Sequence, residues 1–526
     1  MNPSPYVLHR RLPKLLAAFC VPWLLLSLPG TLTSGDWRLM TLPVEALLLA
    51  GVLMALPLAA RGWLVWPVAL VAAVAGGLQI LDQGFIYFLG RPLNPVLDAG
   101  LVPRLWELMQ GALGLAITAL VAALLVAGLA ALLLALHWSV AVFANTRAPL
   151  AGMVVAVLAA VAWQAGGPVT AHTSPTVRAI AERGVEMIGE RRAFEAELAQ
   201  DGFVARLPEQ PLARLEGHDV LVVFIESYGR QAIDQARYFD TVEPALEQLQ
   251  DSVESRGFAM KSGWSEAPII GGQSWLAHAT LLSGLWIDNQ IRYQVLAQAE
   301  PAMLSHVFAE AGWHNALVMP AITRAWPEKT FMGFEEHLFA DDLGYTGKPY
   351  NWVTMPDQYT LYAFEERTRT PEAPPLFATL ALISSHAPWT PIPPVIEDWS
   401  EIGDGAIFSQ WADDGDPPEV LWLDPERVRQ QYTLSIDYVL RTLAGYVEEM
   451  RERPFLMIAL GDHEAGAIVA GADAPRDVPV HLIASERELL EPFADWEYRQ
   501  GAFPDAEGRV PPMDRFRDFL VEQYSR

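Results

Sequence analysis

The sequence predicts an α-helical membrane bundle of five spans followed by an α/β domain with a mainly parallel sheet. Five long apolar stretches fill the first third of the chain, and short apolar runs alternate with helix-like stretches in the remainder. Charge divides the chain at the same place. Residues 1–166 hold five acidic and eight basic residues, so the net charge of −26 comes from the residues that follow. A chain of 526 residues is long enough for both parts.

The five apolar stretches are candidate membrane spans because a bilayer-crossing helix needs about 20 mostly apolar residues. The third and fourth stretches contain no charge, which argues against buried helices of a soluble protein. Basic residues precede the first stretch, as in a signal peptide, but it lacks a convincing cleavage site and we expect a membrane anchor. The stretches are Leu15–Leu32, Leu42–Ala60, Trp63–Leu81, Ala112–Leu136 and Ala148–Gly166.

The distribution of Lys and Arg between the spans predicts the orientation, because cytoplasmic loops carry an excess of both. With the N-terminus in the cytoplasm, more of these residues fall on the cytoplasmic side than outside. The two groups are Arg10, Arg11, Lys14, Arg61 and Arg147 inside, and Arg38, Arg91 and Arg104 outside. Five spans then place the C-terminal domain outside the cytoplasmic membrane, so we expect a multi-pass inner-membrane protein.

The part after the spans begins with a charged helix over Ser174–Asp201, which starts with Ser-Pro, a typical helix beginning. We expect three parts: spans over 1–166, a linker with this helix over 167–215, and an outer domain over 216–526. Apolar runs without alternation recur in that domain, as in strands covered on both faces. The runs are Val220–Ile225, Ala316–Met319, Phe377–Ile383, Phe455–Leu460 and Val478–Ile483; predicted helices include Pro244–Ser255, Met303–Ala311 and Val428–Met450.

Composition excludes several function classes. An acidic domain without a basic stripe repels phosphate backbones, so we expect no nucleic acid as a partner. The only cysteine is Cys20, within the first apolar stretch, which excludes disulfides, cysteine-clustered zinc and a catalytic cysteine in the outer domain.

The acidic, Trp-rich segment Glu397–Asp424 interrupts the strand and helix pattern and is predicted to be a surface insertion near the site.

Polar residues follow four of the apolar runs. In open α/β sheets ligands bind beyond the carboxyl ends of the strands, so these residues are expected at one rim. They are Glu226, Arg324, His386 and the pair Asp462 and His463. Each residue alone is typical of a helix cap or of the protein surface. The occurrence of all five at one rim of the sheet predicts a metal and phosphate site.

Carboxylate oxygens and an imidazole suit a divalent metal ion, here Mn²⁺ first, with Mg²⁺ or Zn²⁺ as alternatives. Glu226, Asp462 and His463 would leave a fourth position for a nucleophile. Ser274, in Gly271-Gly272-Gln273-Ser274, is the candidate, because a hydroxyl at a helix start beside a cation has a lowered pKa. An ordinary helix cap at Ser274 fits the local sequence equally well.

The combination of these motifs downstream of five spans resembles the sulfatase-like branch of the alkaline phosphatase superfamily. Within it, the chain is most similar to lipoteichoic acid synthases and related membrane phosphoglycerol transferases. The motifs are Val-Leu-Val-Val-Phe-Ile-Glu226-Ser, Gly-Gly-Gln-Ser274, Ser-Ser-His386-Ala-Pro-Trp and Leu-Gly-Asp462-His463-Glu. They lie within Asp219–Ser485.

The resemblance implies a role for each of these residues. Glu226, Ser274, Asp462 and His463 match the single metal site, and Ser274 matches the nucleophile, which is usually Thr in this branch. His386 matches the histidine that contacts the substrate phosphate or its headgroup. Arg324, before Gly333-Phe334, resembles the substrate-contacting arginine.

Differences between this sequence and related families make some of their activities less expected for this chain. The Cys/Ser-x-Pro-x-Arg context of sulfatases is absent after Ser274, which disfavours arylsulfatase activity. Membrane phosphoethanolamine transferases usually have a disulfide-rich outer domain, which this chain cannot form. We find no second metal set as in alkaline phosphatases proper, and we expect His278 and His481 to be structural or supporting residues.

The leading interpretation is a metal-dependent phosphotransferase that moves a phospholipid headgroup, of the phosphoglycerol type, to an envelope glycan or polymer through a covalent serine intermediate. The expected partners are a phospholipid donor, a glycan or polymer acceptor and the membrane. A hydrolase of the same superfamily, either a phosphodiesterase or sulfatase-like, is the alternative. A non-catalytic envelope binding protein is the alternative from another class.

Overall fold

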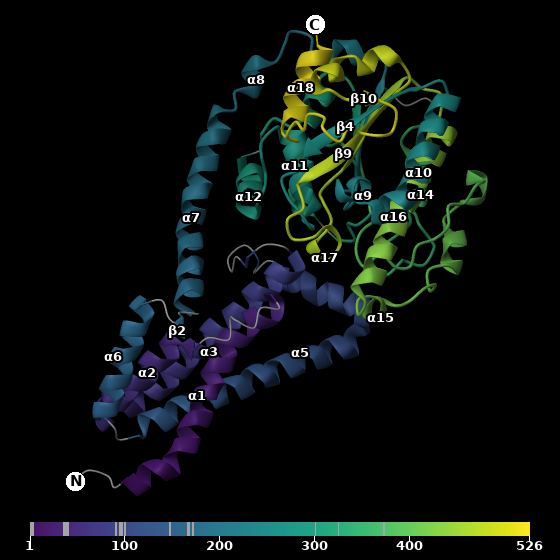
Figure 1. Ribbon diagram of the computed structural model, residues 1–526. Helices are drawn as coiled ribbons and strands as arrows, with labels where there is room; N and C mark the ends of the chain where they lie inside the picture. Colours follow the sequence, from purple (N-terminus) through teal and green to yellow (C-terminus); the bar gives the residue numbers. More distant parts are fainter. Residues whose placement is uncertain are drawn as a thin grey trace. The chain divides into compact units, whose positions relative to one another are not determined.

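The computed structural model describes residues 5–34, 42–89, 92–93, 98, 101–146, 149–165, 169–170, 173–299, 301–324, 326–371 and 374–525. The chain divides into two compact units, Met1–Ile188 and Gly189–Arg526. The border falls within one long helix, α7 (Thr173–Gln200), where the charged helix is expected (Figure 1). The domain borders expected at 166 and 215 stay a prediction.

Each of the five apolar stretches coincides with a helix in the described part of the first unit. Two segments, Arg61–Ile86 and Leu115–Ala144, are long and apolar enough to cross a membrane, and the apolar segments of the other three helices are shorter. Five spans therefore remain a prediction. The helices are α1 (Pro5–Ser34), α2 (Val44–Ala55), α3 (Leu58–Leu89), α5 (Leu101–Ala144) and α6 (Pro149–Ala165), and β1 (Leu42–Pro43) pairs with β2 (Val169–Thr170).

The surface of α5 is apolar. Leu120, Leu124 and Val126 are 59%, 63% and 67% exposed. Such a surface is costly in water and stable in lipid, where the helix also satisfies its own backbone groups. These features indicate a membrane-embedded helical region.

Close packing and one buried cation hold this unit together. A Cβ on Gly51 of α2 would lie 2.7 Å from the carbonyl oxygen of Gly152 on α6, so the two helices approach through small residues. Arg61 is buried, and its guanidinium donates to carbonyls at the ends of α2 and α5, including those of Met54 (2.8 Å) and Ala144 (3.0 Å). Of the cationic residues that predict the orientation, Arg38, Arg91 and Arg147 lie outside the described residues.

The second unit contains an eight-stranded sheet in its described residues, with the order β10-β4-β9-β8-β3-β7-β5-β6. Every residue of β3, β7 and β8 is buried, as expected for apolar runs without alternation. The strands are β3 (Asp219–Ile225), β4 (Ala259–Glu266), β5 (His314–Met319), β6 (Glu336–Phe339), β7 (Leu376–Leu382), β8 (Phe455–Gly461), β9 (Asp477–Ala484) and β10 (Arg499–Gln500).

The sheet is mixed, so the expectation of a mainly parallel sheet is not confirmed. β8, β3, β7, β5 and β6 are parallel, but β9 pairs antiparallel with β8 and with β4, and β10 pairs antiparallel with β4. A parallel return needs a crossover connection, usually a helix. Between β8 and β9 the only helix in the described chain is α17 (Ala467–Ala470), so β9 runs back beside β8.

Helices cover the sheet on both sides. α10, α14 and α16 group on one side, and α11, α12 and α18 lie on the other (Figure 1). α10 begins earlier than expected, so Pro244 lies inside it. The segment Glu397–Asp424 is mostly irregular, as expected of an insertion. The helices are α8 (Phe203–Arg206), α9 (Gln231–Asp234), α10 (Ala236–Ser255), α11 (Ser274–Ser283), α12 (Gln290–Ala299), α13 (Leu304–Glu310), α14 (Asp357–Arg367), α15 (Pro418–Leu421), α16 (Pro425–Glu449), α17 and α18 (Arg515–Tyr524), with 3₁₀ turns η2 (Ala213–Leu215), η3 (Pro327–Met332), η4 (Trp399–Glu401), η5 (Ala406–Gln410), η6 (Arg487–Leu490) and η7 (Pro492–Trp496).

A buried ion cluster joins the start of β3 to α14. The guanidinium of Arg369, which is not exposed, donates to Asp219 (2.8 Å) and to Glu365 (3.0 Å). Arg369→Met leaves two carboxylates without this partner, so we expect the free energy of unfolding to fall by about 3–5 kcal/mol. Denaturant unfolding followed by Trp fluorescence measures the loss.

The matched control for this prediction is Arg191→Met. Arg191 pairs with Glu195 at 2.8 Å, but the two side chains are 55% and 47% exposed. Exposed pairs contribute about 0–1 kcal/mol. Equal stability losses in the two variants would show that burial of the Arg369 cluster does not determine its contribution.

Candidate metal and nucleophile site

The site begins where two neighbouring strands end. β3 and β8 are parallel, and Ile225 pairs in register with Gly461. Glu226 and Asp462 directly follow these residues, so the register places the two carboxylates side by side. A Cβ on Gly461 would lie 1.9 Å from the carbonyl oxygen of Tyr228, so only glycine permits this close approach of the strand end to the β3 loop.

The structure brings Glu226, Ser274, Asp462 and His463 together. Ligand atoms of Glu226, Asp462 and His463 lie within 4.8 Å of one another, and all three side chains are buried. The hydroxyl of Ser274 donates to Glu226 Oε2 at 2.8 Å and lies 3.3 Å from His463 Nε2. The predicted convergence of these four residues is present, while their chemical roles stay a prediction.

Ser274 is the first residue of α11 but does not cap it, which corrects the expectation of a capping serine. The cap position is Gln273, and no side chain there bonds to the helix start. Gly271, Gly272 and Gln273 have φ of 74°, 115° and 69°, so the chain makes a left-handed turn immediately before the helix. This turn directs the Ser274 hydroxyl to Glu226 and His463 instead of to the backbone of α11.

Hydrogen bonds fix the orientation of the other three side chains. His463 Nδ1 lies 3.0 Å from the carbonyl oxygen of Glu464, which can only accept, so Nδ1 donates there and Nε2 is the atom that faces the cluster. Asp462 Oδ1 accepts from the backbone N–H groups of Ser227 (2.8 Å) and His463 (2.7 Å). The Ser227 hydroxyl donates to Glu226 Oε1 at 2.9 Å.

The electrostatics of the cluster fit a divalent cation. Burial and the Glu226 carboxylate raise the pKa of Asp462 to about 8. Burial alone lowers the pKa of His463, but Asp462 and Glu226 raise it to about 10. Asp462 and His463 therefore retain protons at pH 7 that a cation would replace. The donor set of two carboxylates, an imidazole and a hydroxyl also suits Mn²⁺, Mg²⁺ or Zn²⁺.

His386 lies on the loop after β7, and the same loop is tied to the cluster. The hydroxyl of the neighbouring Ser385 donates to the Glu226 carbonyl oxygen at 2.5 Å. Burial acts to raise the pKa of Glu226, but the positive charges of His386 and His463 hold it well below its usual range. The loop that carries His386 therefore borders the cluster, and contact of His386 with substrate stays a prediction.

The orientation of His386 depends on Trp352, which the sequence motifs do not single out. The two rings stack with centroids 3.8 Å apart. His386 Nδ1 lies 2.5 Å from the carbonyl oxygen of Ala387, so Nδ1 donates and Nε2 is the atom left for substrate. No spacing in the sequence signals this contact, because Trp352 and His386 are separated by α14 and β7.

The remaining candidate residues have different environments. Arg324 follows β5, its side chain is exposed, and its contact with substrate stays a prediction. His278 is buried on α11, and its ring lies 4.1 Å from that of Phe224. His481 is buried between Ser262 (2.8 Å) and Tyr228 (3.1 Å). Burial lowers the pKa of both histidines to about 3, so they are neutral at pH 7.

Comparisons with known proteins give structural neighbours only. No protein-family model and no curated protein matches the sequence. The chain is similar to the lipoteichoic acid synthase LtaP from Listeria monocytogenes, with 13% identity over 52% of this chain and 67% of that chain and a TM-score of 0.37. It is similar to the Streptococcus pyogenes phosphoglycerol transferase GacH, with 14% identity over 64% of this chain and 80% of that chain and a TM-score of 0.39.

A third neighbour contains both a membrane part and a soluble part. It is the integral membrane protein lipooligosaccharide phosphoethanolamine transferase A from Neisseria meningitidis, with 13% identity over 97% of this chain and 96% of that chain and a TM-score of 0.48. The first two neighbours come from the groups that the sequence motifs resemble, whereas the third is a phosphoethanolamine transferase, a group whose usual disulfide-rich outer domain this chain cannot form. With identities of 13–14% and TM-scores below 0.5, a function must be supported by the side chains of the site.

Proposed function

We propose that this chain is a membrane-anchored, metal-dependent phosphotransferase that moves a phospholipid headgroup, of the phosphoglycerol type, onto an envelope glycan or polymer. The observation that carries the proposal is the hydroxyl of Ser274, which points to Glu226 and His463 and caps no helix. A bound divalent cation, Mn²⁺ in the first instance, would supply a Lewis acid that stabilises negative charge on the phosphoryl oxygens. Glu226, Ser274, Asp462 and His463 are the residues that would hold it.

The proposed transfer has two steps, first from the lipid to Ser274 and then from Ser274 to the acceptor. Ser274 Oγ attacks the lipid phosphorus while its proton passes to Glu226 Oε2, the atom to which it already donates. The phosphorus–oxygen bond to diacylglycerol breaks, the leaving oxygen takes the proton that Glu226 accepted, and the headgroup phosphate stays esterified to Ser274. An acceptor hydroxyl then attacks the same phosphorus and gives its proton to Glu226, which returns it to the leaving Ser274 oxygen. His386 Nε2 and Arg324 hold the phosphoryl oxygens in both steps.

Covalent catalysis suits two dissimilar substrates. A lipid donor and a bulky polar acceptor need not occupy the site at the same time, because the intermediate separates the two events. The decisive experiment incubates the purified full-length protein with a mixed phospholipid extract and Mn²⁺. Mass spectrometry should detect diacylglycerol and a Ser274 peptide that carries the headgroup phosphate. Release of the free headgroup phosphate at the same rate, with or without acceptor, would indicate a hydrolase instead.

Truncating Trp352 should impair the use of substrate. Stacked aromatic pairs contribute about 0.5–1.5 kcal/mol, so Trp352→Ala should raise the donor KM by about 2–12-fold because His386 is no longer held. Trp352→Phe keeps an aromatic face and should recover most of this loss. Steady-state kinetics and the Mn²⁺-dependent melting temperature test the prediction. An unchanged KM in Trp352→Ala, or a loss of the metal response in either variant, would contradict it.

The predicted topology places the catalytic unit outside the cytoplasm, where a phospholipid donor and an envelope acceptor are both accessible. An alkaline phosphatase reporter fused after Arg526 should therefore be active, and a fluorescent protein that folds only in the cytoplasm should be dark at the same position. The expectation follows from five spans and the Lys/Arg distribution. An inactive alkaline phosphatase together with a fluorescent protein that folds would place the C-terminus in the cytoplasm. That result would exclude an odd number of spans with a cytoplasmic N-terminus.

A further inference from the structure

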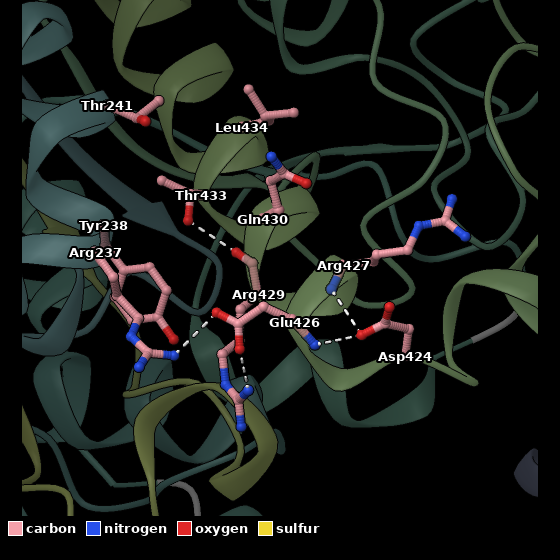
Figure 2. A pocket seen from close by; sticks show the side chains of 10 residues that line it. All are labelled: Arg237, Tyr238, Thr241, Asp424, Glu426, Arg427, Arg429, Gln430, Thr433 and Leu434. Atoms are coloured by element: carbon pink, nitrogen blue, oxygen red, sulfur yellow. Dashed lines mark hydrogen bonds and ion pairs between the residues drawn. The ribbon is translucent and has the colours of Figure 1, made fainter.

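A cavity of about 510 Å³, lined mainly by charged and polar residues, opens at the beginnings of α10 and α16 (Figure 2). α10 leads into β4 and α16 leads into β8, and β4 and β8 run in the same direction. Both helices therefore begin at the same end of the strands as Glu226 and Asp462. The lining residues are Arg237, Tyr238, Thr241, Asp424, Glu426, Arg427, Arg429, Gln430, Thr433 and Leu434.

The charges in this cavity are already compensated by one another. Glu426 lies between Arg237 and Arg429, at 3.3 Å and 2.9 Å (Figure 2). Arg427 pairs with Asp416. The carboxylate of Asp424 accepts from the first backbone N–H groups of α16 and so occupies the helix start. A phosphate group, which needs uncompensated cations, would have to break these pairs first.

The remaining chemistry of the lining favours a ligand with many hydroxyl groups. Leu434 is the only aliphatic side chain among the ten, so a purely apolar ligand does not fit. Guanidinium groups and carboxylates supply donors and acceptors side by side, and Gln430 and Thr241 can each do both. A volume of about 510 Å³ lies within the range of ligand pockets, about 300–1,000 Å³.

One aromatic layer separates the cavity from the candidate active site. Tyr238 lines the cavity and meets Tyr432 edge to face, with centroids 5.6 Å apart. The Tyr432 hydroxyl donates to the Ser227 carbonyl oxygen at 3.0 Å, and the Ser227 hydroxyl donates to Glu226. Tyr432 also contacts Trp389, on the loop of His386, with centroids 5.6 Å apart. The cavity thus adjoins both loops that form the site.

We propose that this cavity binds the carbohydrate portion of the acceptor. The term acceptor rests on the proposed function, whereas binding of a polyhydroxylated ligand does not depend on it. Asp424, the last residue of the insertion Glu397–Asp424, is the one residue of that segment among the lining residues. Tyr238 and Tyr432, which are both buried, would connect binding in the cavity to the loops of the candidate active site.

The experiment uses the full-length Ser274→Ala protein in lipid nanodiscs, so that binding is measured without turnover. Saturation-transfer NMR with gentiobiose and cellobiose reports binding of neutral disaccharides, and inorganic phosphate serves as the anionic probe. Arg237→Met and Gln430→Ala should each weaken disaccharide binding about tenfold, equivalent to about 1.4 kcal/mol. The control Arg499→Met, which removes another exposed arginine paired with a carboxylate, should bind as the parent does.

Three results would overturn the inference: no disaccharide binding by the parent protein, unchanged binding in both cavity variants, or displacement of the disaccharide by inorganic phosphate at equal concentration. The proposed function fails separately. If the chain with Ser274 intact never forms the headgroup adduct while disaccharides bind in the cavity, the transferase assignment is wrong and the carbohydrate site stands. If the adduct forms but disaccharide binding is unchanged in the Arg237 and Gln430 variants, the assignment of the cavity as the carbohydrate site is wrong.

Discussion

Replacing Ser274 by Ala should lower turnover at least about 1000-fold and remove the headgroup adduct. The loss of a covalent nucleophile has an effect of this size because no other group in the cluster offers an attacking oxygen in the same place. Ser274 makes its hydrogen bonds to Glu226 and His463 and none to the start of α11, so the substitution should leave the helix intact. Diacylglycerol release and mass spectrometry of the Ser274 peptide measure the two effects.

Ser274→Thr is the matched variant, because it keeps a hydroxyl at the same position. It should form the adduct and retain part of the activity, because the hydroxyl survives and the side chain is only half-buried. Thermal unfolding of both variants checks that the outer unit is folded. If Ser274→Ala turns over at nearly the wild-type rate, an activated water is the nucleophile and the protein belongs with the hydrolases.

The interior strands of the fold could be predicted because burial on both faces leaves a continuous apolar run. β3, β7 and β8 are of this kind. β4 was missed, because its sequence Ala-Met-Lys-Ser-Gly-Trp-Ser-Glu contains polar residues whose groups are satisfied by tertiary contacts, such as Ser262 with His481. The direction of β9 was also not predictable, since an apolar run is the same in either direction.

The candidate site shows the same division between local and tertiary signals. Glu226, Asp462 and His463 follow apolar strands directly, so a rule on strand ends is enough to find them. The expected capping role of Ser274 was wrong because three successive residues with positive φ turn the chain before α11, and a pattern of residue types does not specify such a turn. Trp352 reaches His386 only through the folded arrangement of α14 and β7.

Asp462→Asn should separate the stability of the metal-free protein from its response to metal. Oδ1 of an asparagine can keep the two hydrogen bonds accepted from the backbone of Ser227 and His463. Its amide can also donate to Glu226, in place of the proton that a neutral Asp462 shares with that carboxylate. Asp462 is already neutral below about pH 8, so the substitution removes no charge there and the metal-free variant should unfold at about the wild-type temperature.

The response to Mn²⁺ should behave in the opposite way. A ligand at 100 times its dissociation constant stabilises the folded state by about 2.7 kcal/mol, so the wild-type melting temperature should rise with Mn²⁺ and fall back with EDTA. The increment should be larger at pH 8.5 than at pH 6.5, because the raised pKa values of Asp462 and His463 make protons compete with the cation. Asp462→Asn should lose most of this increment at both pH values.

The control for the Mn²⁺ response is Asp437→Asn, which removes a carboxylate that pairs with Arg441 at 2.9 Å on α16. It should keep the full increment, because Asp437 is not part of the cluster. A lower melting temperature of metal-free Asp462→Asn would mean that the carboxylate stabilises the cluster through hydrogen bonds that an amide cannot replace. An Mn²⁺ increment that survives in Asp462→Asn would remove Asp462 from the ligand set, and the cation would then have to be held elsewhere than between the ends of β3 and β8.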